Sequence, residues 1–344
     1  MSHVGPRPGL NLRVRHKTDT NSPRAERMDA TPVVERAFPD RTVREVGDTG
    51  PSWNPDTATV RVAFATHPPA YLKCARDGER IRRERAAIEF VADTTDVAVP
   101  TVLRADPDGQ RPYLATEAMT GDSLLARWSG ADGETRRKLA AGVGRTLARV
   151  HEQRFDTAGR VVGGDGEGLR LDPAAWPDVL AESIRHTRAM TDATRYDDYF
   201  DRLLDALDGW RDRLTDAPAV LLHGDPARPN AVVSAGSVGL LDWERAHVGD
   251  PVRDLYRARS QQFAPTRGRA DPAIVAAYHE GYAAVAGSLP DGYDQRRPVY
   301  EAVRLTGPVA FFDNYVAFDD TDETAFAGWL ETEIEQRLAA LTDS

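Results

Sequence analysis

The 344-residue chain contains a single cysteine, Cys74. One cysteine cannot form an internal disulfide, and it cannot complete the cysteine and histidine spacing of a structural zinc site. No apolar run approaches the roughly 18 residues that a membrane-spanning helix needs, and no signal-peptide pattern opens the sequence. We therefore expect a protein of the reducing cytoplasm that has no membrane span.

Lysine is scarce as well, so almost all of the positive charge is arginine. The chain has 44 Lys and Arg against 54 Asp and Glu, which gives a net charge of −10. This balance disfavours nucleic acid as the main partner. Lysine occurs only at positions 17, 73 and 138, and an acidic, arginine-for-lysine composition is typical of salt-adapted proteins. A lysine at position 73, inside a predicted strand, therefore indicates a specific function.

Several common active-site signatures are absent. There is no G-x-S-x-G motif, so no Ser-His-Asp triad is indicated. Neither the G-x-G-x-x-G nor the G-x-x-x-x-G-K-[ST] phosphate loop occurs. The loop Gly47–Pro55, with sequence GDTGPSWNP, remains a candidate phosphate cover through its backbone amides and the Ser52 hydroxyl. The alternative is an ordinary turn.

The length suits two lobes rather than one small core. Residues 1–30 are polar and basic and predict a disordered tail, with Met28 as the favoured true start. Residues 31–119 predict a small lobe of strands with one helix, at Thr59–Ala65, Ala70–Ala75, Glu79–Ala92 and Tyr113–Glu117. Residues 120–344 predict a mainly helical lobe, with helices at Arg136–Gln153, Trp176–Met190, Tyr196–Leu214, Pro272–Val285, Pro298–Ala317 and Thr324–Leu341. The fold class is α+β.

One predicted β-hairpin interrupts these helices and places two polar residues together. Residues 231–233 and 238–241 are β-prone, and Ala235–Ser237 is the predicted turn. A hairpin centred on residue 236 makes Asn230 and Asp242 cross-strand neighbours, about 5 Å apart at Cα. A carboxylate beside an amide oxygen suits Mg²⁺. Asp225, on the preceding loop, is then close enough to act on a phosphate group held by that metal.

Lys73 and Glu84 form a second candidate pair. Lys73 lies on a predicted strand, and the turn at residues 77–78 folds the helix that carries Glu84 back onto it. A lysine paired with a glutamate can present its ammonium group to phosphate oxygens. The alternative is an exposed lysine on an edge strand, and the downstream polar residues favour the pair.

Four further features have both a structural and a functional interpretation. Residues 117–121 connect the two lobes, and their backbone can also pair with an adenine edge. Asp250 is predicted to cap a helix that begins at Pro251. Asp254, in the first turn of that helix, is predicted to brace the catalytic loop through backbone hydrogen bonds. His223 is predicted to brace the loop rather than to act as a general base.

These segments resemble the aminoglycoside phosphotransferase and choline kinase-like family, which has a bilobal protein-kinase-like fold. The resemblance covers residues 33–341. It rests on HGDPARPN at 223–230, LLDWERAHVGDPVRDL at 240–255, LKCARDGERIRRERAAIEF at 72–90 and TEAMTG at 116–121.

The resemblance implies a role for each of the matching residues. Asp225 is the expected catalytic residue, Asn230 and Asp242 are the expected Mg²⁺ ligands, and Lys73, fixed by Glu84, is expected to contact the ATP phosphates. The backbone of Glu117, Ala118 and Met119 is expected to bind adenine. Position 227, where protein kinases carry lysine, is alanine, and Arg228 is expected to supply the missing charge.

The sequence therefore predicts an ATP- and Mg²⁺-dependent kinase that phosphorylates a hydroxyl group of a small molecule. Only eight residues separate Asp242 from Asp250, which leaves no room for the activation segment of a protein kinase. Two alternatives stay open: a regulatory pseudokinase that binds nucleotide, and an antibiotic-modifying kinase of the same fold. The sequence does not identify the acceptor, does not distinguish ATP from GTP as the phosphate donor, and does not give the oligomeric state.

Overall fold

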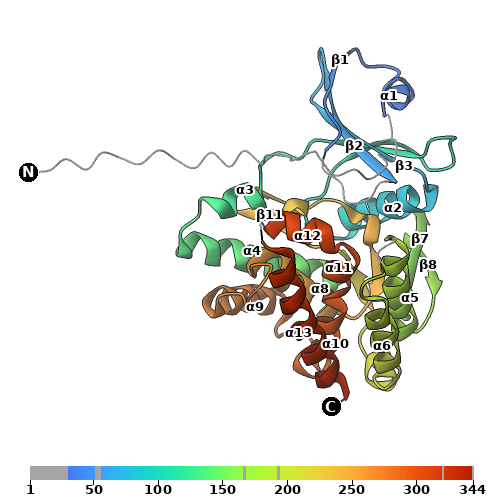
Figure 1. The fold of residues 1–344 in the computed structure, drawn as a ribbon. Helices are drawn as coiled ribbons and strands as arrows, with labels where there is room; N and C mark the ends of the chain where they lie inside the picture. The colour runs from blue at the N-terminus through green and yellow to red at the C-terminus, as the bar shows by residue number, and fades with distance from the viewer. Residues whose placement is uncertain (1–29, 51–55, 166–167, 192–193, 320, 343–344) are drawn as a thin grey trace, which may run out of the picture.

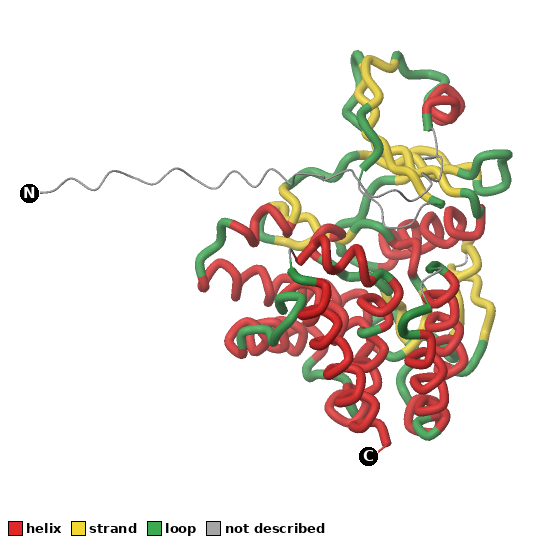
Figure 2. Tube along the Cα trace, in the orientation of Figure 1, coloured by secondary structure: helices red, strands yellow, loops and turns green. Residues whose placement is uncertain are grey.

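The computed structural model describes residues 30–50, 56–165, 168–191, 194–319 and 321–342. A small lobe built on a twisted β-sheet lies against a larger lobe of helices, with helix α2 (Gly78–Thr94) between them (Figure 1). Figure 2 shows the same division, with one helix-poor sheet in the upper lobe and a lower lobe that is mostly helical but has strands along one side. The predicted α+β, bilobal fold class is therefore confirmed.

The small lobe is a five-stranded antiparallel sheet with the order β1-β2-β3-β5-β4. Its strands are β1 (Val43–Val46), β2 (Thr57–Phe64), β3 (Ala70–Ala75), β4 (Val102–Asp106) and β5 (Tyr113–Glu117). Alternating side chains of β2 are buried, as the period of two predicts. One face of the sheet packs Val62 and Leu72 against the short helix α1 (Thr31–Ala37). The strands predicted at Ala70–Ala75 and Tyr113–Glu117 have the predicted bounds.

Helix α2 begins where the sequence indicates and joins the sheet to the rest of the molecule. The Asp77 side chain caps it by accepting a hydrogen bond from the Glu79 backbone N–H. Its apolar stripe, which includes Ile81, Ile88 and Val91, is buried in the larger core cluster that extends through the helical lobe. Because α2 shares that core, the side chains on its other positions are held in a fixed place relative to both lobes.

The larger lobe contains two small sheets and most of the helices. One sheet has the order β11-β10-β6 and the other has the order β8-β7-β12-β9. The strands are β6 (Asp122–Ser123), β7 (Gly159–Asp165), β8 (Gly168–Pro173), β9 (Val220–Leu222), β10 (Ala231–Ser234), β11 (Ser237–Leu240) and β12 (His247–Gly249). The helices are α3 (Leu124–Ser129), α4 (Gly133–His151), α5 (Trp176–Ala189), α6 (Asp197–Asp208), α7 (Arg211–Thr215), α8 (Pro251–Ala258), α9 (Pro272–Ala286), α10 (Tyr293–Arg304), α11 (Thr306–Ala310), α12 (Phe312–Asp319) and α13 (Glu323–Thr342).

Two predicted helices are wrong in extent. The helix predicted at Tyr196–Leu214 breaks after Asp208, where Gly209 and Trp210 separate α6 from α7. The helix predicted at Pro298–Ala317 begins five residues earlier, at Tyr293, and is interrupted twice. Strands β7 and β8 were not predicted, because glycines interrupt the apolar residues of β7 and the alternation in β8 is limited to Leu169 and Leu171. In the part of the chain that the structure describes, no helix is both long and apolar enough to cross a membrane.

Candidate active site

The hairpin β10–β11 closes one residue earlier than the sequence predicts. Its register pairs Ala231 with Leu240 and Ser234 with Ser237, so the turn is the two residues Ala235 and Gly236. Both have positive φ, 48° and 84°, which is the geometry of a type I′ turn. The prediction of a turn centred on residue 236 is therefore wrong, because an alanine with positive φ is not evident from sequence.

The earlier turn changes which residue faces Asn230. The Leu241 backbone N–H donates to the Asn230 carbonyl at 2.8 Å, so Leu241, and not Asp242, is the residue opposite Asn230. Asp242 lies two residues after the end of β11 in a left-handed conformation, with φ 65° and ψ 63°. A non-glycine residue in this region costs of order 1 kcal/mol and is concentrated at functional sites. Asn230 and Asp242 thus lie at the same open end of the hairpin, one residue out of direct opposition.

The loop of residues 223–230 carries Asp225, the predicted catalytic residue, and is called the catalytic loop here. A buried carboxylate fixes it. Asp254, which is fully buried in α8, accepts hydrogen bonds from the backbone N–H groups of His223 at 2.6 Å and Gly224 at 3.1 Å. Gly224 has φ 81°, and a Cβ there would lie 2.1 Å from the carbonyl oxygen of Arg245, so only glycine fits. The predicted brace by Asp254 is confirmed.

The neighbouring predictions for His223 and Asp250 are also confirmed. The His223 Nε2 lies 2.8 Å from the Leu241 carbonyl, and its Nδ1 accepts from the Asp225 backbone N–H at 3.2 Å. Burial lowers the pKa of His223, which keeps it neutral and suits an Nε2 donor with an Nδ1 acceptor. Asp250 caps α8 by accepting from the Val252 backbone N–H at 3.0 Å.

Asp225 is held by an arginine that the sequence reasoning missed. Arg257 donates to Asp225 Oδ1 from Nε at 3.0 Å and from Nη2 at 2.9 Å. Burial disfavours the charged carboxylate, but Arg257 and Arg245 outweigh it and lower the pKa of Asp225 to about 2. Arg228 instead lies over the Trp128 ring, 5.6 Å from its centre. Arg257 lies three residues after Asp254, on the same face of α8, and that spacing was the available signal.

Lys73 lies at the centre of a cluster of three carboxylates. Its Nζ is 2.8 Å from Glu84 Oε2 and 2.9 Å from Glu244 Oε2, and it also forms a short ion pair with Asp242. Burial opposes the ammonium charge, but Asp242, Glu84 and Glu244 together raise the pKa of Lys73 well above its ordinary value. The predicted contact between Lys73 and Glu84 is confirmed, whereas its role toward phosphate stays a prediction.

Glu244 and Arg80 extend this cluster across the two lobes. Arg80, on α2, donates to Glu244 Oε1 at 3.0 Å, and Arg83 donates to the Glu244 backbone carbonyl at 3.2 Å. Lys73 and Arg80 together cannot neutralise the three carboxylates of Glu84, Asp242 and Glu244. Burial together with the neighbouring acids raises the pKa of Glu84 to about 7. The cluster therefore has capacity for further positive charge.

The oxygen atoms that face the open end of the hairpin fit a hard cation. The Asn230 Nδ2 donates to the Asp225 carbonyl at 3.0 Å, and no residue that the structure describes donates to the Asn230 Oδ1, which can act as a ligand. Asp242 uses only one oxygen in its contact with Lys73. Among the residues described by the structure, the carboxylates of Asp242, Glu84 and Glu244 also lie within 4.8 Å of one another. An oxygen-only set of this kind suits Mg²⁺.

The connector between the lobes borders a cavity of about 300 Å³. The backbone N–H groups of Glu117 and Ala118 are already used, by the carbonyls of Thr101 at 2.9 Å and Pro69 at 3.2 Å. Within the described ranges, the Met119 N–H makes no such backbone hydrogen bond. Of the three residues expected to bind adenine, Met119 is therefore the one whose N–H is not used by such a bond to a described residue. In the candidate phosphate loop, the Gly47 and Gly50 backbone N–H groups donate to the carbonyls of Arg61 and Thr59, each at 2.8 Å, so neither is open to phosphate. Residues 51–55, which include Ser52, lie outside the described residues.

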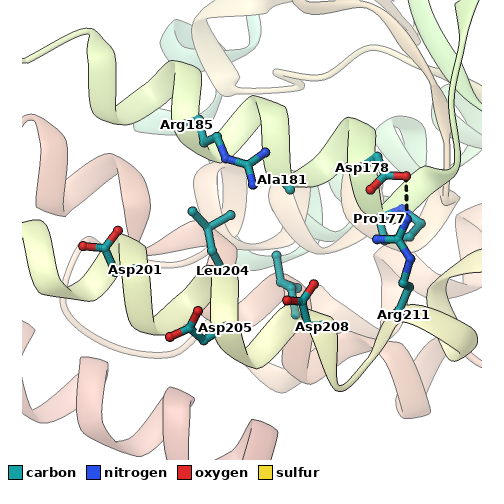
Figure 3. A pocket seen from close by; sticks show the side chains of 10 residues that line it. Pro177, Asp178, Ala181, Arg185, Asp201, Leu204, Asp205, Asp208 and Arg211 are labelled. Atoms are coloured by element: carbon teal, nitrogen blue, oxygen red, sulfur yellow. Dashed lines mark hydrogen bonds and ion pairs between the residues drawn. The ribbon is translucent and has the colours of Figure 1, made fainter.

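A second groove, of about 260 Å³, is formed by α5, α6 and α7 (Figure 3). It is lined by acidic side chains, including Asp205 and Asp208, and by Arg211, which pairs with Asp178 at 2.7 Å. None of its lining residues belongs to the catalytic loop, the hairpin or the Lys73 cluster. We assign it no role in the chemistry.

Three features lie between the two lobes: an aspartate on a loop, two side chains with oxygen atoms of the kind that bind metal ions, and a lysine anchored to a helix. Together they are typical of kinase-like phosphotransferases. The family model described as the phosphotransferase enzyme family matches residues 54–288, and the chain belongs to this family. A comparison with curated proteins finds no match.

Two solved structures illustrate the shared fold. One is a ternary complex of a thermostable mutant of aminoglycoside phosphotransferase APH(4)-Ia with ADP and hygromycin B. It is 14% identical with a TM-score of 0.59, and the match covers 90% of this chain and 97% of that chain. The other is macrolide 2'-phosphotransferase MphH from Brachybacterium faecium, which is 17% identical with a TM-score of 0.54, over 91% of this chain and 97% of that chain.

Proposed function

We propose that this phosphotransferase transfers the γ-phosphoryl group of ATP, in the presence of Mg²⁺, to a hydroxyl group of a small molecule. The observation that carries the proposal is the convergence of Asp225, Asn230, Asp242 and Lys73 at the junction of the two lobes. They come from β3, the catalytic loop and the end of the hairpin. Helix α2 and Asp254 hold these segments in place.

Each proposed binding residue has a defined task. Asn230 Oδ1 and the Asp242 carboxylate would hold Mg²⁺, which when bound neutralises charge on the phosphates. Lys73 would turn from Asp242 toward the phosphates while Glu84 keeps its ammonium in place. The Met119 N–H would donate a hydrogen bond to an acceptor nitrogen on the adenine edge. The structural neighbour that binds ADP supports a nucleotide site in this fold.

The transfer itself requires positioning more than covalent chemistry. The acceptor oxygen forms a bond to the γ-phosphorus as the bond from that phosphorus to the β–γ bridging oxygen breaks, and ADP leaves with the electron pair. The acceptor proton passes to the Asp225 carboxylate. With a pKa of about 2, Asp225 is a weak base, which suits a loose transition state in which proton transfer occurs late.

We further propose that the two lobes divide between residues 119 and 120, inside the connector. The protein is proposed to act in the cytoplasm on a small molecule and not on nucleic acid. A regulatory pseudokinase remains the rival function, and the four converging residues count against it.

The experiment that tests this function is an ADP-release screen over a panel of sugars, amino sugars, hydroxy acids, amino alcohols and aminoglycosides. It is run with Mg²⁺ at low and high salt, because the acidic composition indicates salt adaptation. We expect acceptor-dependent ADP formation that stops when EDTA removes the metal. Tight ATP binding with no turnover of any acceptor would instead support the pseudokinase.

A further inference from the structure

The pair formed by Asp225 and Arg257 is arranged to leave one carboxylate oxygen open. Both hydrogen bonds from Arg257 go to Oδ1. Oδ2 receives no hydrogen bond from any residue that the structure describes, so it is available to an acceptor hydroxyl. The Asp225 and Arg257 side chains are 23% and 21% exposed. The guanidinium therefore lies at the surface that an acceptor must approach.

A second arginine is linked to this pair through one serine. The Ser260 hydroxyl donates to the Arg257 carbonyl at 3.0 Å, and Arg304 Nε donates to the Ser260 Oγ at 3.2 Å. The Arg304 guanidinium also lies 5.8 Å from the centre of the Tyr315 ring. Ser260 thus joins the end of α8 to the end of α10.

Arg304 differs from its neighbours on α10 in having no acidic partner. Arg296 is paired with Asp250 at 2.6 Å, and Arg297 lies 3.7 Å from Glu301. Across the described ranges, no carboxylate lies within ion-pair distance of Arg304. Asp225 is the carboxylate beside Arg257, and that contact already occupies Oδ1. The acceptor side of Asp225 therefore has more positive than negative charge, although the chain as a whole is acidic.

The local backbone is unusual at the same place. Residues Arg259–Phe263 form a π-helical turn, η3, directly after α8, and such turns are frequent at functional sites. Within this turn, Gln262 Nε2 donates to the carbonyl of Pro226, the residue after Asp225, at 2.5 Å. The Gln262 side chain is fully buried, and its Oε1 has no partner among the described residues. The turn therefore ties the catalytic loop to Ser260 and leaves one buried acceptor atom unused.

We propose that Arg257 and Arg304, the second positioned by Ser260, form an acceptor subsite for an acidic group, so that the substrate is a hydroxyl compound carrying a carboxylate or a phosphate. The inference rests on the proposed kinase function and names its substrate class. Guanidinium groups bind such oxyanions in a planar, charge-assisted geometry. A cationic amino sugar in the same place would face two arginines, one of which has no counter-charge.

The test uses acceptors in matched sets that differ in one group. One set is galactose, galacturonate and galactosamine, and the other is glycerol and glycerol 3-phosphate. ADP release is measured for the full chain with Mg²⁺-ATP. We expect the acid-bearing member of at least one set to have a kcat/KM about tenfold or more above its neutral partner, which is the effect of one charge-assisted hydrogen bond. The two sets distinguish carboxylate from phosphate.

Two variants of Arg304 then test the assigned residue. Arg304→Met is expected to raise KM for the acidic acceptor about tenfold, and Arg304→Glu is expected to move the preference toward galactosamine. Neither variant is expected to change the Kd of Mg²⁺-ATP, because Arg304 has no contact with Lys73 or Asp242. Arg202→Met, which removes an exposed pair with Glu335 on the far helices α6 and α13, serves as the control and is expected to behave as wild type.

The outcomes separate this proposal from the one on which it rests. If neutral or amino acceptors are phosphorylated as well as or better than acids, or if Arg304→Met leaves the preference unchanged, the kinase function stands and the acidic subsite is refuted. If Mg²⁺-ATP binds and no acceptor is phosphorylated, the kinase function itself fails, and the subsite fails with it.

Discussion

Replacing Asp254 with asparagine is expected to destabilise the protein and to impair the catalytic loop at the same time. Asp254 is fully buried and accepts the backbone N–H groups of His223 and Gly224. Burial opposes its charge, but His151, His223 and Arg253 keep the pKa of this carboxyl well below its usual range. The amide of asparagine keeps one acceptor oxygen and turns an NH₂ donor toward a backbone N–H. One charged hydrogen bond is therefore lost and one donor is left unpaired.

The magnitude follows from these two changes. A hydrogen bond to a charged group contributes about 1.5–3 kcal/mol, and an unsatisfied buried donor costs about 1–3 kcal/mol. Because the backbone can relax, we expect a loss of about 2–3 kcal/mol in the free energy of unfolding, well above the usual effect of a surface substitution. Urea unfolding followed by tryptophan fluorescence measures it, and Asp208→Asn, at the exposed end of α6, is the control. A variant as stable and as active as the control would refute the brace.

Three further predictions concern the proposed site and the fold. Lys73→Met is expected to raise the KM for ATP tenfold or more, because the phosphates lose a charged partner, and an unchanged KM would exclude Lys73 from the phosphate site. Asp242→Asn is expected to raise the Mg²⁺ concentration needed for half-maximal activity at least tenfold, and an unaltered metal dependence would remove Asp242 from the ligand set. Burial and Arg253 lower the pKa of His247 well below its unfolded value of about 6.5. The unfolded state then binds the extra proton first, so the free energy of unfolding is fully maintained above pH 6.5 and falls below it, by up to about 1.4 kcal/mol per pH unit. His247→Gln should flatten this slope in urea titrations between pH 5 and pH 7, and an identical slope would count against the assignment.

The two-lobe fold could be predicted because most of its elements depend on local patterns. The apolar stripe of α2 and the alternation of β2 are both legible along the chain. The β7–β8 hairpin was missed because its glycines and arginines have no such pattern, and tertiary pairing with β12 maintains it. Helix α10 begins at Tyr293 and contains Pro298 in its interior, so the preference of proline for the first turn of a helix indicated the wrong start.

The candidate site was predicted unevenly for a similar reason. Lys73 and Glu84 meet across a short turn, so their contact follows from local geometry. Glu244 and Arg80 are separated by 164 residues, and Arg257 and Asp225 by 32. Those pairs depend on how the lobes and α8 pack, which no local spacing encodes. The predicted hairpin register is wrong by one residue, because the observed register depends on Ala235 adopting a positive φ.

The ion cluster also has a consequence for how the two lobes work together. Lys73 and Arg80 come from the small lobe, whereas Asp242 and Glu244 come from the large lobe. Lys73 and Asp242 form an ion pair with each other. Bound nucleotide would compete for Lys73, and bound metal would compete for Asp242. Binding should therefore rearrange the contact between the lobes while Glu84 and Glu244 keep Lys73 in place.

The central claim is that Asp225 performs the transfer in an otherwise intact nucleotide site, and Asp225→Asn tests it most directly. Acceptor-dependent ADP formation and the Kd of Mg²⁺-ATP are measured on the same preparation, the second by isothermal titration calorimetry. The account predicts a loss of about 10²–10⁴-fold in kcat, as for other removed acid–base groups, with a Kd within twofold of wild type. A variant that binds Mg²⁺-ATP normally and turns over at the wild-type rate would contradict it.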